Sequence, residues 1–459
     1  MRYRNFLLSA LCTATLVGCA THVEKAPQAL PIPAQWRGQV GPSAPVEMGW
    51  WRAFGDADLN RLVDQALRNN LDILTARSRV DQYRAELRAA QGDNFPTLDA
   101  GVNVAHSRSL SSATGQPYET AVFQGLLQSN YDVDLWGSRR SSITAAESSL
   151  AAQQAAAAAA ELTVASSVAS GYMTLVALDE QLRVTEATLA TRADSLRLAQ
   201  RQFETGYTSK LEWVQSESEY QTAKGQIPAL KHQIAQQENA LSILAGMNPR
   251  EIARSRRFDR VAPQTLPSLL PSELLRRRPD IAQAERTLVA ADASLISSRA
   301  KLLPSLNLTA SGTLQSSSLH QLLDNPFRLW SIGGSVLAPL LNREALTAQV
   351  DVAMASRNQA LYGYEKTVRN AFSEVNNDLD AISRYQEQLV ELQKQEEVVS
   401  EALRIARNRY QNGYASYLDE LDAQRTLFST QLNLVQLKNN LLQAQIDLYR
   451  ALGGGWKNP

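Results

Sequence analysis

Apolar and polar residues alternate in two segments of the chain that lie about 208 residues apart. A period of two is typical of a strand with one apolar and one polar face. The apolar positions are Leu98, Ala100, Val102 and Val104 in the first segment and Leu306, Leu308 and Ala310 in the second. We therefore predict a strand from about residue 97 and another from about residue 305.

A second, less regular strand is expected after each of these, over residues 121–135 and 329–339. The segments between, residues 107–119 and 315–326, are rich in Ser, Gly and Pro and are predicted to be exposed loops. The chain would thus contribute two strand pairs, within residues 97–135 and 305–340.

Two very long segments contain nothing that breaks a helix. Residues 138–204 and 343–411 are dominated by Ala, Gln, Glu, Arg and Leu, which favour helix. Each helix would be about 100 Å long at 1.5 Å per residue, too long for an ordinary globular core. Shorter helices are expected at residues 57–94, 209–245, 272–302 and 416–452. The helices at 209–245 and 272–302 would return along the first long helix, and the other two along the second, with Gly206 and Gly413 at the hairpin turns.

Two apolar stripes with a spacing of seven follow the last helix. They are formed by Leu421, Phe428, Val435 and Leu442, and by Leu427, Leu434, Leu441 and Leu448. Heptad spacing imposes left-handed supercoiling, and two stripes indicate two neighbouring helices. An ordinary bundle with a wide apolar stripe is the alternative.

The chain is a tandem duplication, because it matches itself at a separation of about 207 residues. Residues around Arg197 to Leu211 recur around Arg404 to Leu418, and Gly246 recurs as Gly453. We predict a first repeat at 56–249 with a hairpin at 138–245, a linker at 250–271, a second repeat at 272–453 with a hairpin at 343–452, and a tail at 454–459.

The N-terminus has the layout of an export signal, with Arg2 and Arg4 before an apolar run. Residues 16–19, Leu-Val-Gly-Cys, match a bacterial lipobox. We expect residues 1–18 to be removed, Cys19 to carry a diacylglycerol and an N-acyl chain, and 19–55 to form a lipidated extension. Ala20 in place of aspartate favours the outer membrane. An ordinary signal peptide that contains a cysteine is the alternative.

Composition excludes several function classes. The 46 basic and 46 acidic residues balance without a basic block, so nucleic acid is not an expected partner. The four histidines are scattered, with no metal-ligand spacing or phosphate-binding loop. Cys12 and Cys19 are the only cysteines. We expect no catalytic site, metal or cofactor other than the acyl chains.

Four strands cannot close a barrel, since the smallest membrane barrels have about eight. Three copies would supply twelve strands. The expected fold class is therefore mainly α with a membrane β-barrel contribution, in which long duplicated helical hairpins extend the barrel as a periplasmic tunnel.

Several motifs resemble those of the outer-membrane factors, the TolC/OprM family, in its lipoprotein (NodT-type) branch. They are Trp50-Trp51 with Phe54-Gly55-Asp56, Asn69 to Asp72, Asp132 to Gly137, Arg278 to Ile281, and Tyr410 to Gln424. The resemblance covers nearly all of the mature chain. It implies a homotrimeric outer-membrane channel of a tripartite efflux pump, which passively conducts drugs or other small toxic compounds. Its partners would be a periplasmic adaptor and an inner-membrane transporter, here of the RND type. One departure, residues 340–343, leaves the strand-to-helix junction there open.

The resemblance also implies a periplasmic gate. The matching positions are Leu418, an apolar constriction, and Asp419 and Asp422, an acidic ring, with Glu212 at the corresponding acidic position of the first repeat. Both aspartates would also suit the start of a helix after Ser416.

The hairpin tips are the expected adaptor contacts, formed by Gly206 and Tyr207 in one repeat and Gly413 and Tyr414 in the other. The glycines would also suit a turn alone.

Three other functions fit parts of the pattern. Type I secretion uses the same architecture. A periplasmic coiled-coil spacer lipoprotein without a pore would need no amphipathic strands, and an enzyme has the least support. The substrate range, the particular partners and the resting state of the gate do not follow from the residues.

Overall fold

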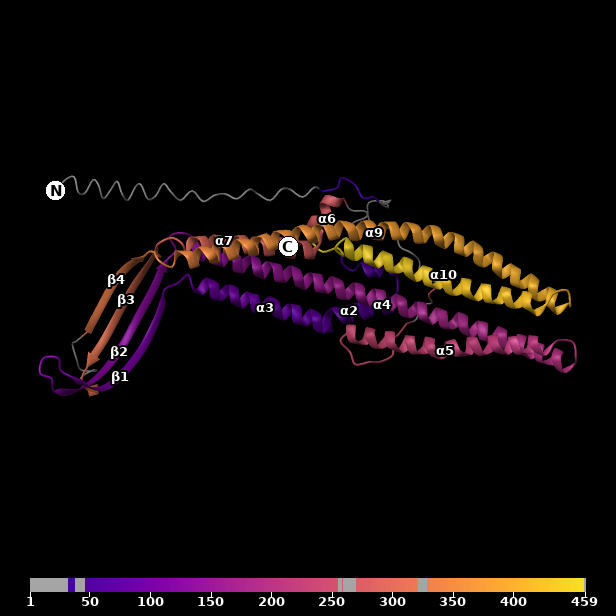
Figure 1. Cartoon of the computed structure of the whole chain (residues 1–459), viewed down its shortest axis with the longest axis horizontal. Helices are drawn as coiled ribbons and strands as arrows, with labels where there is room; N and C mark the ends of the chain where they lie inside the picture. The colour runs from indigo at the N-terminus through magenta and orange to yellow at the C-terminus, as the bar shows by residue number, and fades with distance from the viewer. Residues whose placement is uncertain (1–31, 38–45, 255–257, 259–269, 321–327, 458–459) are drawn as a thin grey trace. The chain divides into compact units, whose positions relative to one another are not determined.

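The structure is a computed structural model that describes residues 32–37, 46–254, 258, 270–320 and 328–457 (Figure 1). All helices and strands below belong to the unit formed by Ala34–Pro459. The predicted signal segment, Cys19 and most of the linker at 250–271 lie outside the described residues, as do parts of the loop at 315–326 and of the tail at 454–459.

The described elements are mainly helical, with one four-stranded sheet, which confirms the fold class predicted for the chain. Their order is η1 Trp50–Phe54, α2 Ala57–Asn69, α3 Leu71–Gly92, β1 Thr97–Leu110, β2 Pro117–Val133, α4 Ser138–Glu204, α5 Lys210–Leu244, α6 Pro271–Arg277, α7 Pro279–Ala300, β3 Ser305–Ser316, β4 Arg328–Leu337, α9 Arg343–Gln411 and α10 Tyr417–Ala451.

The sheet has the order β1-β2-β3-β4 and is antiparallel throughout. Residues directly opposite each other share one face of a sheet, so the register sorts the side chains into two faces. One face is apolar and carries Leu98, Val102, Val104, Phe123, Leu127, Tyr131, Val133, Leu306, Leu308, Leu314, Trp330, Ile332 and Val336. The other is polar and carries Asp99, Asn103, Gln124, Gln128, Asn130, Asn307, Thr309, Ser311, Gln315, Ser331 and Ser335.

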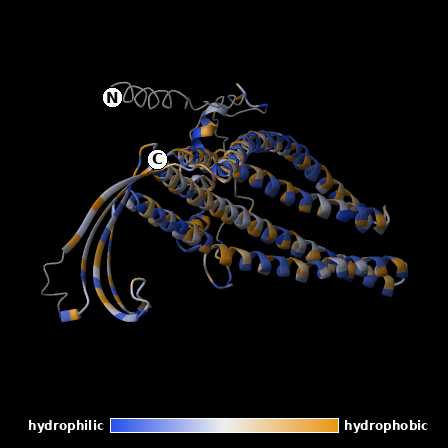
Figure 2. Ribbon diagram, turned by 60° about the vertical axis from the view of Figure 1, so that its left-hand side comes forward, coloured by the Kyte–Doolittle hydropathy of each residue, from blue (hydrophilic) through white to orange (hydrophobic). Residues whose placement is uncertain are grey.

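Nothing within the described chain covers the apolar face of this sheet. Val102 and Ile332 are 82% and 78% exposed, and Figure 2 shows apolar and polar residues alternating along the strands. Among the residues that the structure describes, the edge strands β1 and β4 each pair with one neighbour only. A sheet with an open apolar face and two open edges is not a stable end state for a chain in water.

The predicted loop at 107–119 is wrong in its extent. Strand β1 continues to Leu110 and β2 begins at Pro117, so only residues 111–116 connect them. The polar residues of this segment pair across the hairpin, as in Arg108 opposite Glu119, and such backbone pairing does not require apolar side chains.

The helices form a layer in which most have a neighbour on each side. Near the sheet α4 lies between α3 and α7, and α7 packs against α9; farther away α4 lies between α5 and α10, and α10 packs against α9 (Figure 1). Helix α10 therefore has the two neighbours that its two heptad stripes predicted. The predicted return of residues 57–94 along the second long helix is wrong, because α3 packs along α4.

The layer has two edges. Helix α9 forms one edge over its whole length, and α3 followed by α5 forms the other. Burial differs between an edge helix and an enclosed helix. Helix α9, at the edge, has eight buried residues among 69, whereas α10, which has a neighbour on each side, has seventeen among 35. Both edges expose apolar side chains, among them Leu211 and Val214 on α5 and Val390, Val398 and Ile405 on α9.

Helix α4 contains a window that is apolar enough, by length and composition alone, to cross a membrane. Of that window 56% is buried within the chain, where α4 packs between its neighbours. Its alanines therefore serve close helix packing in this chain.

The predicted helices 57–94 and 272–302 are each broken by one residue. Asn70 leaves the helical region (ψ 131°) and its side chain accepts hydrogen bonds from the backbone N–H groups of Asp72 and Ile73, which caps α3. Arg278 (ψ 124°) precedes Pro279, and a residue before proline is driven out of the helical region.

The residues at the two breaks, Asn70 and Arg278, hold the C-terminal ends of α5 and α10 in the same way. Asn70 Nδ2 donates to the carbonyl of Leu244 (2.9 Å), and Arg278 Nη1 donates to the carbonyl of Ala451 (3.1 Å). The glycines that follow, Gly246 and Gly453, have φ of +69° and +88° and lie against the backbone at each break. The duplication thus repeats a junction at mid-length of the helical layer.

Gly453→Ala tests this junction. An added Cβ would lie 1.9 Å from the carbonyl oxygen of Arg277, in a positive-φ conformation, which costs of the order of 1–3 kcal/mol for the backbone alone. We expect a clearly lower thermal unfolding temperature, followed by circular dichroism. Gly363→Ala in α9 is the control, since a Cβ there meets nothing within 4 Å and alanine favours helix by up to about 1 kcal/mol. Equal effects of the two substitutions would contradict the close approach.

Candidate functional site at the hairpin tips

The two hairpins turn with the same geometry. Gly206 and Gly413 have φ of +78° and +75°. In the first turn the N–H of Tyr207 donates to the carbonyl of Gln202 (2.7 Å), and in the second the N–H of Tyr414 donates to that of Arg409 (2.8 Å). This is a glycine C-cap, in which the positive φ lets the chain reverse after a helix.

The tips expose aromatic and apolar side chains. Tyr207 and Tyr414 are 87% and 77% exposed, and the repeat-related Leu211 and Leu418 are 64% and 57% exposed. A Cβ on either tip glycine would meet nothing within 4 Å, so the backbone conformation alone selects glycine in the isolated chain. The tips are therefore available to a partner.

The two aspartates of the expected acidic ring differ in their surroundings. Asp419 forms a capping box with Ser416, whose N–H and hydroxyl both lie 3.2 Å from its carboxylate. Asp422, one turn later, is exposed, and its carboxylate has no hydrogen bond or ion pair within the described residues. The helix-start interpretation thus holds for Asp419, while the exposed Asp422 carboxylate has no hydrogen-bonded partner of this kind and acts through its charge on Arg425, the pKa of which is raised first by Glu219 and also by Asp422.

Glu212 lies in a different environment from its repeat counterpart Asp419. It is half-buried and close to Tyr410, the pKa of which is raised by burial and by this carboxylate. The Tyr410 hydroxyl donates to Gln202 Oε1 (2.7 Å). The structure therefore brings Glu212 to the contact between the hairpins, beside Tyr410 of α9.

A small apolar cluster joins the two hairpins beside the tips. Tyr410 and Tyr417 pack with ring centroids 5.5 Å apart, against Leu421 and the partly buried Leu198. These residues come from α9, α10 and α4.

An ionic network, buried at Arg192 and Glu219 and exposed at Arg425, joins the hairpins farther from the tips. Glu219 of α5 accepts from Arg425 of α10 (2.5 and 2.9 Å) and pairs with Arg192 of α4 (3.0 Å). Arg192 is 3% exposed, and its guanidinium also donates to the Glu219 carbonyl (2.9 Å) and lies 5.3 Å from the ring centroid of Phe428. Burial lowers the pKa of Arg192, and the Glu219 carboxylate opposes that shift.

Sequence reasoning missed this network, although the repeats contain a signal. At the positions 207 residues away, Arg192 corresponds to Val399, Glu219 to Thr426 and Arg425 to Ser218. Charged residues at positions that the other repeat fills with uncharged ones indicate a role specific to one hairpin. One carboxylate thus compensates two cations and connects three helices, so separation of the hairpins here would leave a buried charge unpaired.

The described residues hold no cluster of His, Cys, Asp and Glu that could bind a metal ion. The tip region consists of two hairpins that end in exposed turns. Apolar and ionic contacts join the two hairpins to each other.

Comparison with known proteins decides the family. The model of the family described as outer membrane efflux protein matches twice, at residues 62–247 and 270–454. The chain belongs to the outer membrane efflux protein family. It is an outer-membrane channel protein, which confirms the resemblance found in the sequence.

Relatives match over almost their whole length. The pyoverdine export outer membrane protein OpmQ of Pseudomonas aeruginosa is 33% identical over 100% of this chain and 98% of its own. The cation efflux system protein CusC of Escherichia coli is 30% identical over 98% and 99%. Among solved structures, the outer-membrane channel OprN has a TM-score of 0.88 at 25% identity, covering 95% of this chain and 100% of its own, and a CusC structure has 0.85 at 29%, covering 94% and 99%.

Glu219→Gln tests the ionic network. It leaves the Arg192 charge buried without a counter-charge, which costs about 3–5 kcal/mol. We expect faster amide hydrogen exchange in α4, α5 and α10 near the network, measured by mass spectrometry.

Asp194→Asn on the same helix is the matched control. Asp194 pairs with Arg197, but both side chains are more than half exposed, and such pairs contribute about 0–1 kcal/mol. Exchange rates that rise equally in both variants would show that Glu219 does not hold the hairpins together.

Proposed function

We propose that three copies of this chain assemble into the outer-membrane channel of a tripartite efflux pump. The channel passively conducts drugs or other small toxic compounds that an adaptor and transporter deliver. The observation that carries this proposal is the pair of open edges. Both the sheet and the helical layer end on each side in an element with one neighbour.

Further copies of the chain satisfy both edges at once. Two copies would give eight strands, a barrel that side chains fill, whereas three give twelve strands and leave a lumen. Helix α9 of one copy would then lie beside α3 and α5 of the next, which would cover the apolar side chains at both edges. Closure removes the unpaired strand edges, as a membrane requires.

The two faces of the sheet set its orientation. The apolar face would contact lipid and the polar face would line the lumen. The helical layer then extends into the periplasm with Gly206 and Gly413 at its far end. The acyl chains expected on Cys19 would anchor the N-terminus in the same membrane.

The partners follow from this arrangement. The tips with Tyr207 and Tyr414 would contact a periplasmic adaptor, which joins the channel to an inner-membrane transporter, by resemblance of the RND type. Curated relatives include a pyoverdine export outer membrane protein, the outer membrane protein of a toluene efflux pump in Pseudomonas putida, and a cation efflux system protein. Such different cargoes on one architecture support a duct whose substrates are selected elsewhere in the pump. Nothing in this role requires catalysis.

Asp422 is the best candidate for a selective gate residue. Its exposed, unpaired carboxylate would occur three times near the narrow end of the duct, and such a ring attracts cations. Leu418 would narrow the same end. Asp419 would contribute charge as well as its cap, and Glu212 would act between the hairpins.

The spacer alternative lacks a use for the amphipathic sheet. A coiled-coil spacer needs no strands with one apolar face. Type I secretion would use the same duct, since its architecture is shared.

Planar-bilayer conductance of the purified, detergent-extracted protein tests the proposal. We expect small cation-selective currents from the wild type, and lower cation selectivity from Asp422→Ala because three charges leave the narrow end. Asp419→Ala should also destabilise α10, by about 0.5–2 kcal/mol for a lost cap.

The two outcomes that oppose the proposal are distinct. Absence of currents would favour the spacer. Currents with unchanged cation selectivity in Asp422→Ala would support the channel but show that Asp422 is not a gate residue.

A further inference from the structure

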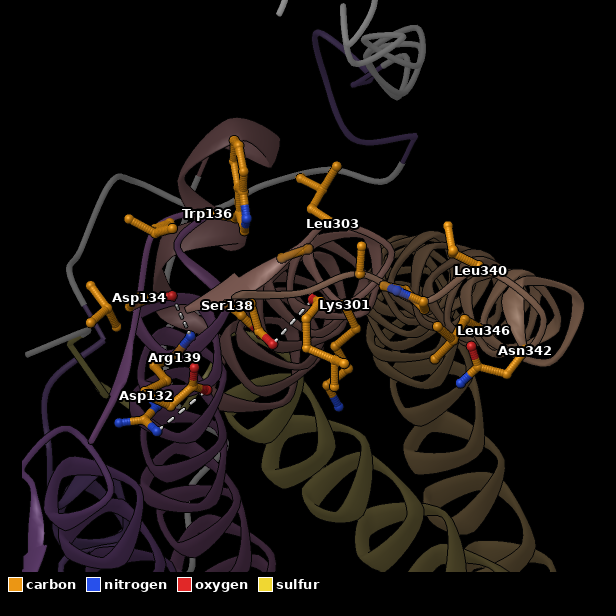
Figure 3. Close-up of a pocket in the computed structure, with 17 residues that line it drawn as sticks. Asp132, Asp134, Trp136, Ser138, Arg139, Lys301, Leu303, Leu340, Asn342 and Leu346 are labelled. Atoms are coloured by element: carbon orange, nitrogen blue, oxygen red, sulfur yellow. Dashed lines mark hydrogen bonds and ion pairs between the residues drawn. The ribbon is translucent and has the colours of Figure 1, made fainter. Parts of the chain in front are cut away.

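The two edges of the helical layer carry opposite charges that have no partner within the described chain. Where the strands meet the helices, by contrast, the carboxylates that line a cavity of about 490 Å³ are paired (Figure 3). Asp134 accepts from the backbone N–H of Arg139 (3.2 Å), and Asp132 lies 3.5 Å from the Arg139 guanidinium. Nearer the tips, Lys224 of α5 and Glu397 of α9 are exposed, and neither forms an ion pair among the described residues.

Helical periodicity places these two side chains on the same face of the layer. Lys224 follows Ala223, which is buried on the side of α5 that packs against α4. Glu397 follows the half-buried Glu396, whose carboxylate accepts from Gln431 of α10 (3.2 Å). One residue further along a helix is a rotation of about 100°. Because α5 and α9 run in opposite directions and face into the layer from opposite edges, this rotation turns both side chains toward one face.

The two residues also lie at the same level. Lys224 is 18 residues from the tip glycine of its hairpin and Glu397 is 16 residues from that of the other, an axial difference of about 3 Å. The tips are level with each other, since Arg425 and Glu219, 12 and 13 residues from their tip glycines, are paired. In a ring of identical copies around one axis, residues at equal distance from the tips meet.

A second pair of opposite charges has the same offset. Glu217 of α5 and Arg404 of α9 lie one heptad nearer the tips, 11 and 9 residues from the tip glycines. Both are exposed. Arg404 pairs with Glu401 one turn away (2.6 Å), whereas Glu217 has no ion pair among the described residues. Charges that flank a contact between packed helices set the choice and orientation of the partner.

The outward surface of α5 beside these charges lacks bulk. Gly225 and Pro228 lie in the interior of the helix and are exposed, although both residue types disfavour helix. A Cβ on Gly225 would meet nothing within 4 Å, so no contact in the described chain requires glycine there. At the same distances from the tip, 19 and 22 residues, α9 carries the exposed Lys394 and Glu391. Long side chains on one edge thus face a flat surface on the other.

We propose that α5 of one copy packs antiparallel on α9 of a second copy in one register, in which Lys224 pairs with Glu397 and Glu217 pairs with Arg404. The inference rests on the proposed assembly of three copies and specifies the contact between them. Contact of α5 with α5, or of α9 with α9, would bring like charges together. The charges therefore favour head-to-tail contacts, which close a ring.

Cysteine cross-linking tests the register. In the full-length protein carrying Lys224→Cys and Glu397→Cys, a short bifunctional thiol reagent should link copies into covalent dimers and trimers. Lys224→Cys with Ser383→Cys is the control and should give no linked species, because Ser383 lies two heptads, about 21 Å, from Glu397 on the same side of α9. Each single variant measures any reaction at the native cysteines. Equal cross-linking of the two double variants would overturn the register.

Charge reversal tests the pairing. Lys224→Glu would place two carboxylates together at each contact between copies. The ratio of trimer to monomer in native mass spectrometry should then fall about fivefold for each contact, since an exposed ion pair contributes up to about 1 kcal/mol. Adding Glu397→Lys should restore the ratio. Glu344→Lys makes the same change of charge at the other end of α9 and should not restore it.

An unchanged ratio in Lys224→Glu, or equal restoration by the two lysine substitutions, would overturn the pairing. The native mass of the wild type separates these results from failure of the assembly itself. A wild-type trimer without register-specific cross-links rejects this contact alone, and a wild-type monomer rejects the assembly and with it the channel.

Discussion

Unsatisfied edges are the constraint on which the rest of this structure depends. The four strands and the helical layer each end in elements that have a neighbour on one side only. Backbone groups at a strand edge and apolar side chains at a helix edge both require partners. Because the same chain leaves both kinds of edge open, one assembly of identical copies can satisfy them together. The pore is then a consequence of closure.

The duplication explains how a single chain forms a wall of this kind. Each repeat supplies two strands, a long helix and shorter helices that cover the long one in two sections. The sections meet where Asn70 and Arg278 hold the ends of α5 and α10. The ionic network of Arg192, Glu219 and Arg425 has no counterpart in the other repeat, so the two hairpins are not equivalent at this level.

Periodicity predicted most of the fold because long helices and amphipathic strands repeat one simple pattern. It failed where a single residue determines where a helix or strand begins or ends. Asn70 breaks a helix by capping the next one, and the pairing of Arg108 with Glu119 extends a strand through polar sequence. The tip residues were found from motifs, but their separate roles were not. Asp419 caps a helix and Glu212 faces the other hairpin, and such differences depend on side-chain contacts that spacing does not contain.

The most direct test is whether the α9 edge of one copy lies beside the α5 edge of another copy. Val214 on α5 and Ile405 on α9 each lie eight residues from their tip glycine and are 47% and 46% exposed. In the full-length protein carrying Val214→Cys and Ile405→Cys, a short bifunctional thiol reagent should produce covalent dimers and trimers, and native mass should be that of three chains. Either single variant should give no trimer. A monomeric mass without cross-linked species would contradict the account.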